Sequence, residues 1–261
     1  MNLRWTASVV ALLLLATACG GSGPDVESTP RRPTAEVTWQ IQYEGEIDPE
    51  AGVGLFDLDL VETPETVMTR LAERGVYLLC YFSAGSLEDW RPDAGQFPAE
   101  VVGEPLDGWP GERWLDIRRL DVLGPLMEAR MDLAVERGCD GVDPDNVNGF
   151  EASSGFDLSA ADQIRYNTWL ADAAHRRGLA IALKNDLNQV AELEPRFDMA
   201  VNEECIQIGE CELEAPFVEA GKVVLGVEYA GDEQQICAES AVLGHRTLIK
   251  HLELDSWVIS C

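Results

Sequence analysis

Two pairs of acidic residues are the clearest candidates for chemistry in this chain. Asp143 and Asp145 flank a proline, and Glu203 and Glu204 are adjacent further along the sequence. Clustered carboxyl groups push one another's pKa values apart, which supplies both an acid and a base or nucleophile. Hydrolysis of a glycosidic bond requires such a pair on opposite sides of the bond that breaks. Lys184, between the two pairs in sequence, could hold one carboxylate ionised.

A metal ion is the alternative explanation for the first pair. The Asp-Pro-Asp-Asn stretch at 143–146 could form an irregular calcium loop, but it departs from the EF-hand pattern because Val147 stands where an oxygen ligand belongs. The histidines, His175, His245 and His251, are scattered, and the sequence has no C-x-x-C motif, so no zinc spacing is found. We therefore expect no metal ion and no cofactor.

Regular elements must position these acids, and eight short runs rich in β-branched and aromatic residues are predicted strands. Helical patterns lie between most of them, among others at 64–74, 122–137 and 159–177. This alternation predicts an α/β fold, a single-domain (β/α)8 TIM-type barrel, with a doubly wound open sheet as the runner-up. The first strand is not followed by G-x-G-x-x-G, which weakens the dinucleotide-binding form of the open sheet. The predicted strands are 37–43, 53–58, 76–82, 140–143, 179–183, 199–202, 223–228 and 246–249.

Polar residues recur where these strands end. In a parallel barrel all carboxyl ends open onto one face, where active sites lie, although helix N-caps favour the same residue types. A long insertion after the third strand, 84–119, adds Trp90, Trp109 and Trp114. Their indole faces can stack on sugar rings, or they can form a small core of the insertion. The residues expected to contact substrate are Trp39, Asp57, Tyr81, Ser83, Trp90, Asp116, Lys184, Asn185, Asn202, Glu228 and Tyr229.

The N-terminus is typical of an exported chain. Residues 1–18 combine an early positive charge, a short apolar run and small residues, as a signal peptide does. Cys19 is predicted to be lipidated, and the alternative is ordinary cleavage that leaves Cys19 as a free thiol. Residues 19–35 predict a flexible, lipid-anchored tether, and 36–261 the barrel domain. We expect a chain anchored to the cell membrane by lipid, or an extracellular one.

The charge of the chain restricts its partners. The formal net charge is −28. Nucleic acid and an anionic membrane surface are poor partners for such a protein, whereas a cationic polymer is a good one. Solubility or adaptation to salt would also account for the charge. We expect a monomer that binds no nucleic acid.

The cysteines predict disulfides. Six follow Cys19, and an even number in an exported chain favours pairing. Cys80 and Cys139 form the pair left over, or Cys80, which lies inside a predicted strand, is a buried free thiol. One predicted bridge would pin the loop that follows the second acid pair, and the other would fix the C-terminus. These two bridges are Cys205–Cys211 and Cys237–Cys261.

Seven strings of residues resemble those of glycoside hydrolase family 114, the endo-α-1,4-polygalactosaminidases. They occur in the family's order and with similar spacing, from position 39 to the C-terminal part of the chain. The strings are WQIQ at 39–42, YFSAGS at 81–86, EDWR at 88–91, WLDIR at 114–118, DGVDPDNV at 140–147, LKND at 183–186 and NEEC at 202–205.

The resemblance implies a (β/α)8 barrel with a strand-like insertion, endo-acting on an α-1,4-linked, galactosamine-containing polysaccharide of the galactosaminogalactan type. The partner would be a cationic or partly acetylated amino-sugar polymer. The catalytic pair falls on Asp145 and Glu203, with Glu203 as acid/base, Asp145 as nucleophile or base, and Asp143 as an additional candidate acid. Two positions depart from the family pattern. Asn148 stands where Asp is frequent, and Ile206 where an aromatic residue is frequent, which would alter the stacking of a sugar.

Two other functions fit the same sequence. The first is a non-catalytic, glycan-binding surface lipoprotein on the same barrel, against which the intact acids argue. The second is a structural surface lipoprotein, against which the polar strand ends and the tryptophan-bearing insertion argue. For a hydrolase, retention or inversion would depend on the separation of the two carboxyl groups.

Overall fold

Eight parallel strands, hydrogen-bonded to one another in chain order, form the wall of the described part of the protein. The structure is a computed structural model that describes residue 1 and residues 29–261. The eight predicted strands and the (β/α)8 TIM-type class are both confirmed. The strands are β1 (Trp39–Gln42), β2 (Leu55–Asp59), β3 (Tyr77–Ser83), β7 (Gly141–Asp145), β8 (Ala180–Lys184), β9 (Met199–Glu203), β10 (Val224–Glu228) and β11 (Arg246–Ile249).

Both faces of the strands are covered. In β3, all seven residues are buried, as expected for parallel strands between a barrel interior and a layer of helices. Successive side chains alternate between the two faces. Leu79 belongs to one apolar cluster, with Ile41 and Val201 of other strands. Its neighbour Leu78 belongs to the larger cluster that includes residues of the helices.

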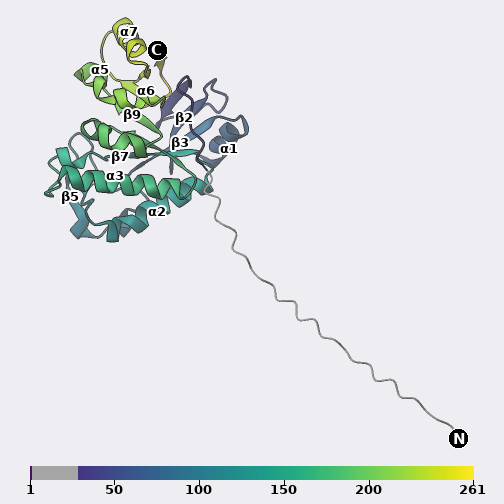
Figure 1. Ribbon diagram of the computed structural model, residues 1–261, viewed down its shortest axis with the longest axis vertical. Helices are drawn as coiled ribbons and strands as arrows, with labels where there is room; N and C mark the ends of the chain where they lie inside the picture. Colours follow the sequence, from purple (N-terminus) through teal and green to yellow (C-terminus); the bar gives the residue numbers. More distant parts are fainter. Residues whose placement is uncertain (2–28) are drawn as a thin grey trace.

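The helices cover the outer face. Figure 1 shows α2 and α3 lying side by side along one side of the sheet. A capping box begins α3: Ser159 Oγ accepts a hydrogen bond from the Asp162 backbone, and the Asp162 carboxylate accepts one from the Ser159 backbone. The three helical patterns at 64–74, 122–137 and 159–177 correspond to α1, α2 and α3. The α-helices are α1 (Glu65–Glu73), α2 (Leu120–Glu136), α3 (Ala160–His175), α4 (Val190–Leu193), α5 (Cys205–Ile208), α6 (Ala215–Glu219) and α7 (Glu233–Leu243).

The alternation of strand and helix fails after the first strand of the barrel and after the last one. The connection from β1 to β2 contains no helix, and β11 is followed by the antiparallel strand β12 (Ile259–Ser260). In the described residues no backbone ladder joins β1 to β11. Instead the Trp39 indole donates to the carbonyl of Arg246 at 2.8 Å, and the Tyr43 backbone donates to the carbonyl of Leu254 at 2.9 Å. The seam is therefore closed by a side chain and by the C-terminal segment.

The insertion after β3 has its own sheet. Its strands β4 (Ser86–Glu88), β6 (Glu112–Leu115) and β5 (Val102–Pro105) are antiparallel in that order. Arg91 fixes the insertion to the barrel, because its buried guanidinium donates both to Asp59 at the end of β2 and to Glu88 of β4. The long loop predicted from the sequence is thus a small structured unit over one side of the barrel mouth.

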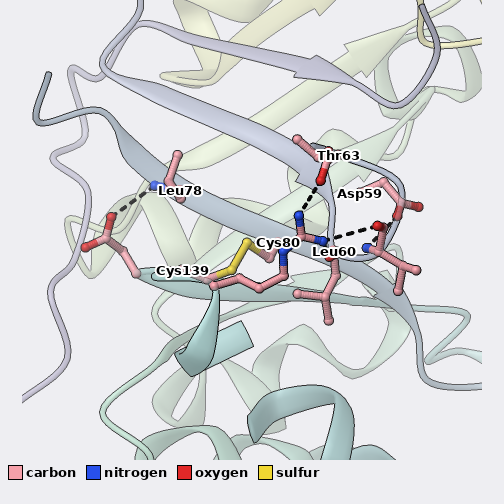
Figure 2. Close-up of a disulfide and its surroundings, with 9 residues drawn as sticks. Asp59, Leu60, Thr63, Leu78, Cys80 and Cys139 are labelled. Atoms are coloured by element: carbon pink, nitrogen blue, oxygen red, sulfur yellow. Dashed lines mark hydrogen bonds between the residues drawn. A yellow bond between two sulfur atoms is a disulfide. The ribbon is translucent and has the colours of Figure 1, made fainter. Parts of the chain in front are cut away.

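Three disulfides are present among the residues that the structure describes. Both expected bridges, Cys205–Cys211 and Cys237–Cys261, are formed, and Cys80 pairs with Cys139 rather than remaining a free thiol. The third bridge ties β3 to the start of β7. Figure 2 shows it among residues of β3 and of the segment after β2. Close by, the Arg137 guanidinium donates to backbone carbonyls of that segment, and Asp140 accepts from the Leu78 backbone.

The residues before β1 also contact the barrel. Arg31 pairs with Asp140, and Arg32 pairs with Asp198. The part of the predicted tether that the structure describes is therefore held against the end of the barrel where the strands begin. The predicted signal peptide and Cys19 lie outside the described residues. Within the described residues, no helix has the length and apolar character needed to cross a membrane.

Candidate active site

A cleft of about 850 Å³ opens between the carboxyl ends of the strands and the insertion. Six of the predicted site residues line it, and they come from five neighbouring strands, β3 and β7 to β10, and the residues that follow them. The inward-facing positions of β3, β7, β8 and β9 lead up to this cleft, as the alternation of side chains requires. The six are Tyr81, Asp145, Lys184, Asn185, Glu203 and Tyr229.

Lys184 is the charge at the centre of the site. Its Nζ lies 3.4 Å from Glu203 Oε2 and 3.5 Å from Asp143 Oδ2, and its side chain is almost fully buried. Although burial opposes it, the two carboxylates hold the pKa of Lys184 well above its ordinary value. Lys184 is therefore an ammonium that binds acids of β7 and β9 together. An ammonium 3.5 Å from Asp143 Oδ2 also disfavours calcium at Asp143, because the two cations would repel each other.

Glu203 is surrounded by hydrogen-bond donors. Tyr229 donates to its Oε1, Asn185 Nδ2 donates to its Oε2 at 2.8 Å, and Lys184 lies beside it. Although burial raises the pKa of Glu203, Lys184 and these hydrogen bonds lower it below its ordinary value overall. Asn185 adopts a left-handed backbone conformation, with φ 53°, and its Oδ1 accepts from the Glu203 backbone at 2.8 Å. Asn185 thereby fixes both the backbone and the side chain of Glu203.

Asp145 and Asp143 have a different environment. The pairing of β7 with β3 stays regular through Pro144 to Asp145, so the two acids share the inner face of the strand. Asp145 lines the cleft, whereas Asp143 is fully buried beneath it. Burial raises the pKa of Asp143 to about 6 against the effect of Lys184, and burial together with Glu203 raises that of Asp145. In the free protein these contacts favour negative charge on Glu203 over Asp145.

Asp57 lies one layer deeper. It is fully buried, and the hydroxyl of Tyr43 donates to its Oδ1 at 3.2 Å. Burial and the neighbouring Asp143 raise the pKa of Asp57 well above its ordinary value. Tyr43 itself lines the cleft, with its ring centroid 4.5 Å from that of Tyr81. Asp57 does not line the cleft and contacts Tyr43, which does, and this position does not fit its predicted role as a contact residue.

Two further predicted contact residues point away from the cleft because each lies one position before a residue that faces it. Asn202 precedes Glu203, and Glu228 precedes Tyr229, so both face outward. Asn202 is buried. Glu228 accepts hydrogen bonds from the backbones of Ile206 and Gln207 and holds the start of α5.

The remaining predicted contact residues have structural contacts. Trp39 closes the seam between β1 and β11. Ser83 is buried and exchanges a hydrogen bond with Ser86. Asp116 pairs with Arg118, and Trp90 is half exposed outside the cleft. Of the two departures from the family pattern, Asn148 lines the cleft, whereas Ile206 does not.

Sequence reasoning missed several cleft residues, most of them on the insertion. Trp109 and Trp114 line the cleft while Trp90 does not, so the aromatic signal was present but did not distinguish among the three. Tyr43 follows β1, and its position at the end of a strand could have identified it as a cleft residue. Glu112 had none, because its position depends on how the insertion folds over the barrel.

One group of described residues has a spacing suited to metal, and it lies outside the cleft. Cys205, Cys211 and His245 bring their ligand atoms within 4.8 Å of one another. The two cysteines are joined as a disulfide, which leaves no thiolate to bind a metal ion. The cleft itself presents carboxylates around an ammonium, an arrangement for acid–base chemistry.

A (β/α)8 barrel with two carboxyl groups at the mouth, one with a raised pKa and one with a lowered pKa, defines a class, the barrel hydrolases that use a carboxyl pair. A sequence model of glycoside hydrolase family GH114 matches residues 22–261. The chain belongs to this family and is a glycoside hydrolase.

Solved structures agree with this assignment. The crystal structure of Aspergillus fumigatus Ega3 in complex with galactosamine is similar over 89% of this chain and 98% of that one, with 35% sequence identity and a TM-score of 0.84. The glycoside hydrolase domain of PelA from Pseudomonas aeruginosa shares the fold, with a TM-score of 0.67 and 13% identity over 85% of this chain and 98% of that domain. A search of curated proteins found no match.

Proposed function

We propose that this glycoside hydrolase is an endo-α-1,4-polygalactosaminidase, with Asp145 and Glu203 as its essential carboxyl groups. The observation that carries the proposal is their common position at the cleft, on β7 and β9, with Lys184 between them in the barrel wall. The galactosamine bound by Ega3, at 35% identity, supports the choice of substrate.

The chemistry requires one carboxyl group to hold a proton and the other to be ionised. Burial raises the pKa of Asp145, while Lys184, Tyr229 and Asn185 lower that of Glu203, so Asp145 is the group of the pair that holds a proton more readily. Because the two groups interact, they titrate as a pair that holds one proton over an intermediate pH range. That singly protonated pair is the form able both to protonate the leaving oxygen and to supply a nucleophile or base.

The charge of the cleft favours a cationic polymer. Five acidic residues line it, and among the described residues that line it Lys184 is the one basic side chain. Lys184 is neutralised by Glu203 and Asp143, so the cleft has a net negative charge. Such a cleft raises the local concentration of a positively charged chain. Trp109 and Trp114 add indole faces on which sugar rings can stack. The five acids are Glu104, Asp107, Glu112, Asp145 and Glu203.

Polymers of graded acetylation test the proposed substrate. The protein is incubated with galactosamine polymers from fully deacetylated to fully N-acetylated, and new reducing ends are counted over time. We expect cleavage that is fastest on the deacetylated chains. Binding of the polymers without any new reducing end would select the alternative, a non-catalytic glycan-binding protein.

We also propose that the chain is exported and anchored by lipid at Cys19. The support is the sequence of residues 1–19 alone. Mass spectrometry of the mature N-terminus in an exporting host tests this, and an unmodified or absent Cys19 would contradict it.

A further inference from the structure

Glu112, the first residue of β6, differs from the other acids that line the cleft. It is only 6% exposed, although it belongs to the insertion and not to the barrel wall. Glu104 and Asp107, on the same rim, are both exposed. The small sheet of the insertion therefore carries one carboxyl group into the cleft and removes most of its contact with water.

No basic side chain of the described chain lies within ion-pair distance of Glu112. The residue directly opposite, Glu88 of β4, is also acidic, but Glu88 is paired with Arg91 and Glu112 is not. Burial raises the pKa of Glu112 to about 7. A buried carboxylate without a cation is unfavourable, so this position favours a positively charged ligand.

A hydrogen-bond chain orients Glu112 and links it to the catalytic strand. Ser86 Oγ donates to Glu112 Oε2 at 2.7 Å, and Ser83 Oγ lies 2.7 Å from Ser86 Oγ. Asn146 Nδ2 donates to both serines, at 3.0 and 3.2 Å. Because the Ser86 hydroxyl donates its hydrogen bond to Glu112, the Ser83 hydroxyl is the donor in the bond between the two serines. All donors of this chain therefore point toward the Glu112 carboxylate. This direction stabilises the ionised form of Glu112.

The same chain sets the position of Glu112 relative to Asp145. Asn146 directly follows Asp145 and has a left-handed backbone, with φ 60°. Its amide side chain reaches the insertion, while its backbone N–H donates to Asp145 Oδ1 at 2.7 Å. Glu112 is thus connected to a reacting carboxyl group through two serines and one asparagine.

We propose that Glu112 forms an ammonium-binding subsite, which accepts the protonated 2-amino group of an unacetylated galactosamine unit next to the bond that is cut. This proposal rests on the proposed function. The carboxylate would pair with the ammonium in a site shielded from water, where charge-assisted hydrogen bonds are strong. N-acetylation removes the positive charge and adds bulk, so the subsite would distinguish amino from acetamido sugars.

The test compares Glu112→Gln with the wild type on the deacetylated and the N-acetylated polymer. Gln keeps the size of the side chain and an oxygen for Ser86 but removes the charge. We expect kcat/KM on the deacetylated polymer to fall about tenfold or more, mainly through KM, with little change on the acetylated polymer. Glu100→Gln is the matched control, because Glu100 is an exposed acid of the same insertion that does not line the cleft.

The pH dependence gives a readout that a structural role would not change. Below about pH 7 Glu112 becomes protonated and loses its attraction for the ammonium, so wild-type kcat/KM on the deacetylated polymer should fall as the pH is lowered through this range. In Glu112→Gln this part of the acid limb should disappear. Circular dichroism and Tm of each variant show whether the insertion stays folded.

The outcomes separate the two proposals. A wild type that cuts neither polymer contradicts the proposed function. If the wild type cuts, two results with a folded Glu112→Gln variant contradict the ammonium subsite alone. The first is an equal loss of activity on both polymers, and the second is no loss of activity on either polymer. Fluorescence titration of the cleft tryptophans with galactosamine oligomers then reports binding directly, and equal affinity of both proteins would overturn the subsite.

Discussion

The acids on the barrel strands and the acids on the insertion meet at one cleft but differ in how their charge is balanced. On the strands, Asp143 and Glu203 share the ammonium of Lys184. On the insertion, Glu112 has no basic partner in the described chain, and its position is fixed by hydroxyl groups. A carboxyl group balanced by an internal cation can be tuned for proton transfer, whereas one without a cation is suited to bind a cation from outside. The comparison assigns chemistry to the strands and recognition to the insertion.

The largest effect should come from the two carboxyl groups that we propose to be essential. Asp145→Asn and Glu203→Gln should each lower kcat by about a thousandfold, because each removes a group that transfers a proton or bonds to the sugar. Both side chains keep their size, so Tm should change little. Reducing-end assays and thermal unfolding measure the two quantities. Near-full activity in either variant would remove that residue from the pair.

The variant Lys184→Met should have the next largest effect. It leaves Asp143 and Glu203 without their cation, and removing one partner of a buried ion pair costs about 3 kcal/mol or more. Lys184 lowers the pKa of Glu203, so its loss should raise that pKa and move the acid limb of kcat/KM to higher pH. The control is Lys222→Met, which removes a lysine paired with Glu194 away from the cleft. An unchanged pH profile would show that Lys184 does not set the charge of Glu203.

The barrel strands were easier to predict from the sequence than the insertion. The eight strands were predictable because short runs rich in β-branched and aromatic residues end in polar residues. The alternating direction of side chains along a strand explains two errors, since Asn202 and Glu228 stand one position from Glu203 and Tyr229 and therefore face outward. The shift in the pKa of Glu203 could be predicted from the sequence only in part. Asn185 acts through a left-handed backbone conformation that no spacing rule predicts.

The insertion was much less predictable. Its length indicated function, but the position of Glu112 depends on an antiparallel sheet whose strands pair out of chain order, β4-β6-β5. Docking of this sheet depends on Arg91, which reaches Asp59 of β2, far away in sequence. The barrel seam is similar, because its closure relies on Trp39 and the C-terminal segment. Contacts of this kind are tertiary and leave little trace in local patterns.

Salt should affect the recognition part of the reaction more than the chemistry. Exposed charges are screened over about 8 Å at physiological ionic strength. The wild type should therefore lose several-fold in kcat/KM on deacetylated polymer between low and high salt, mainly through KM, and less on acetylated polymer. A salt series on both polymers measures this. Equal and flat responses would mean that the acidic surface serves solubility alone.

The disulfides should show the smallest effect on catalysis and a graded effect on stability. In the chain-entropy view, a bridge across 59 residues, as in Cys80–Cys139, contributes about 4 kcal/mol, and one across 6 residues, as in Cys205–Cys211, about 2 kcal/mol. Replacing each pair by Ser should lower the free energy of unfolding in that order. The Cys205–Cys211 variant should lose more activity, because this bridge holds the segment that follows Glu203. Urea unfolding and kcat measured on the same samples test both parts, and the opposite order of activity would contradict the positioning role.

The most direct test of the account is the size of the products made from deacetylated α-1,4-linked galactosamine polymer. Size-exclusion chromatography follows the wild type and a variant carrying both Asp145→Asn and Glu203→Gln. The account predicts an early fall in polymer length to intermediate oligomers with the wild type and no change with the variant. Release of monosaccharide from an otherwise full-length polymer would contradict endo action, and equal shortening by both proteins would contradict the assignment of the carboxyl pair.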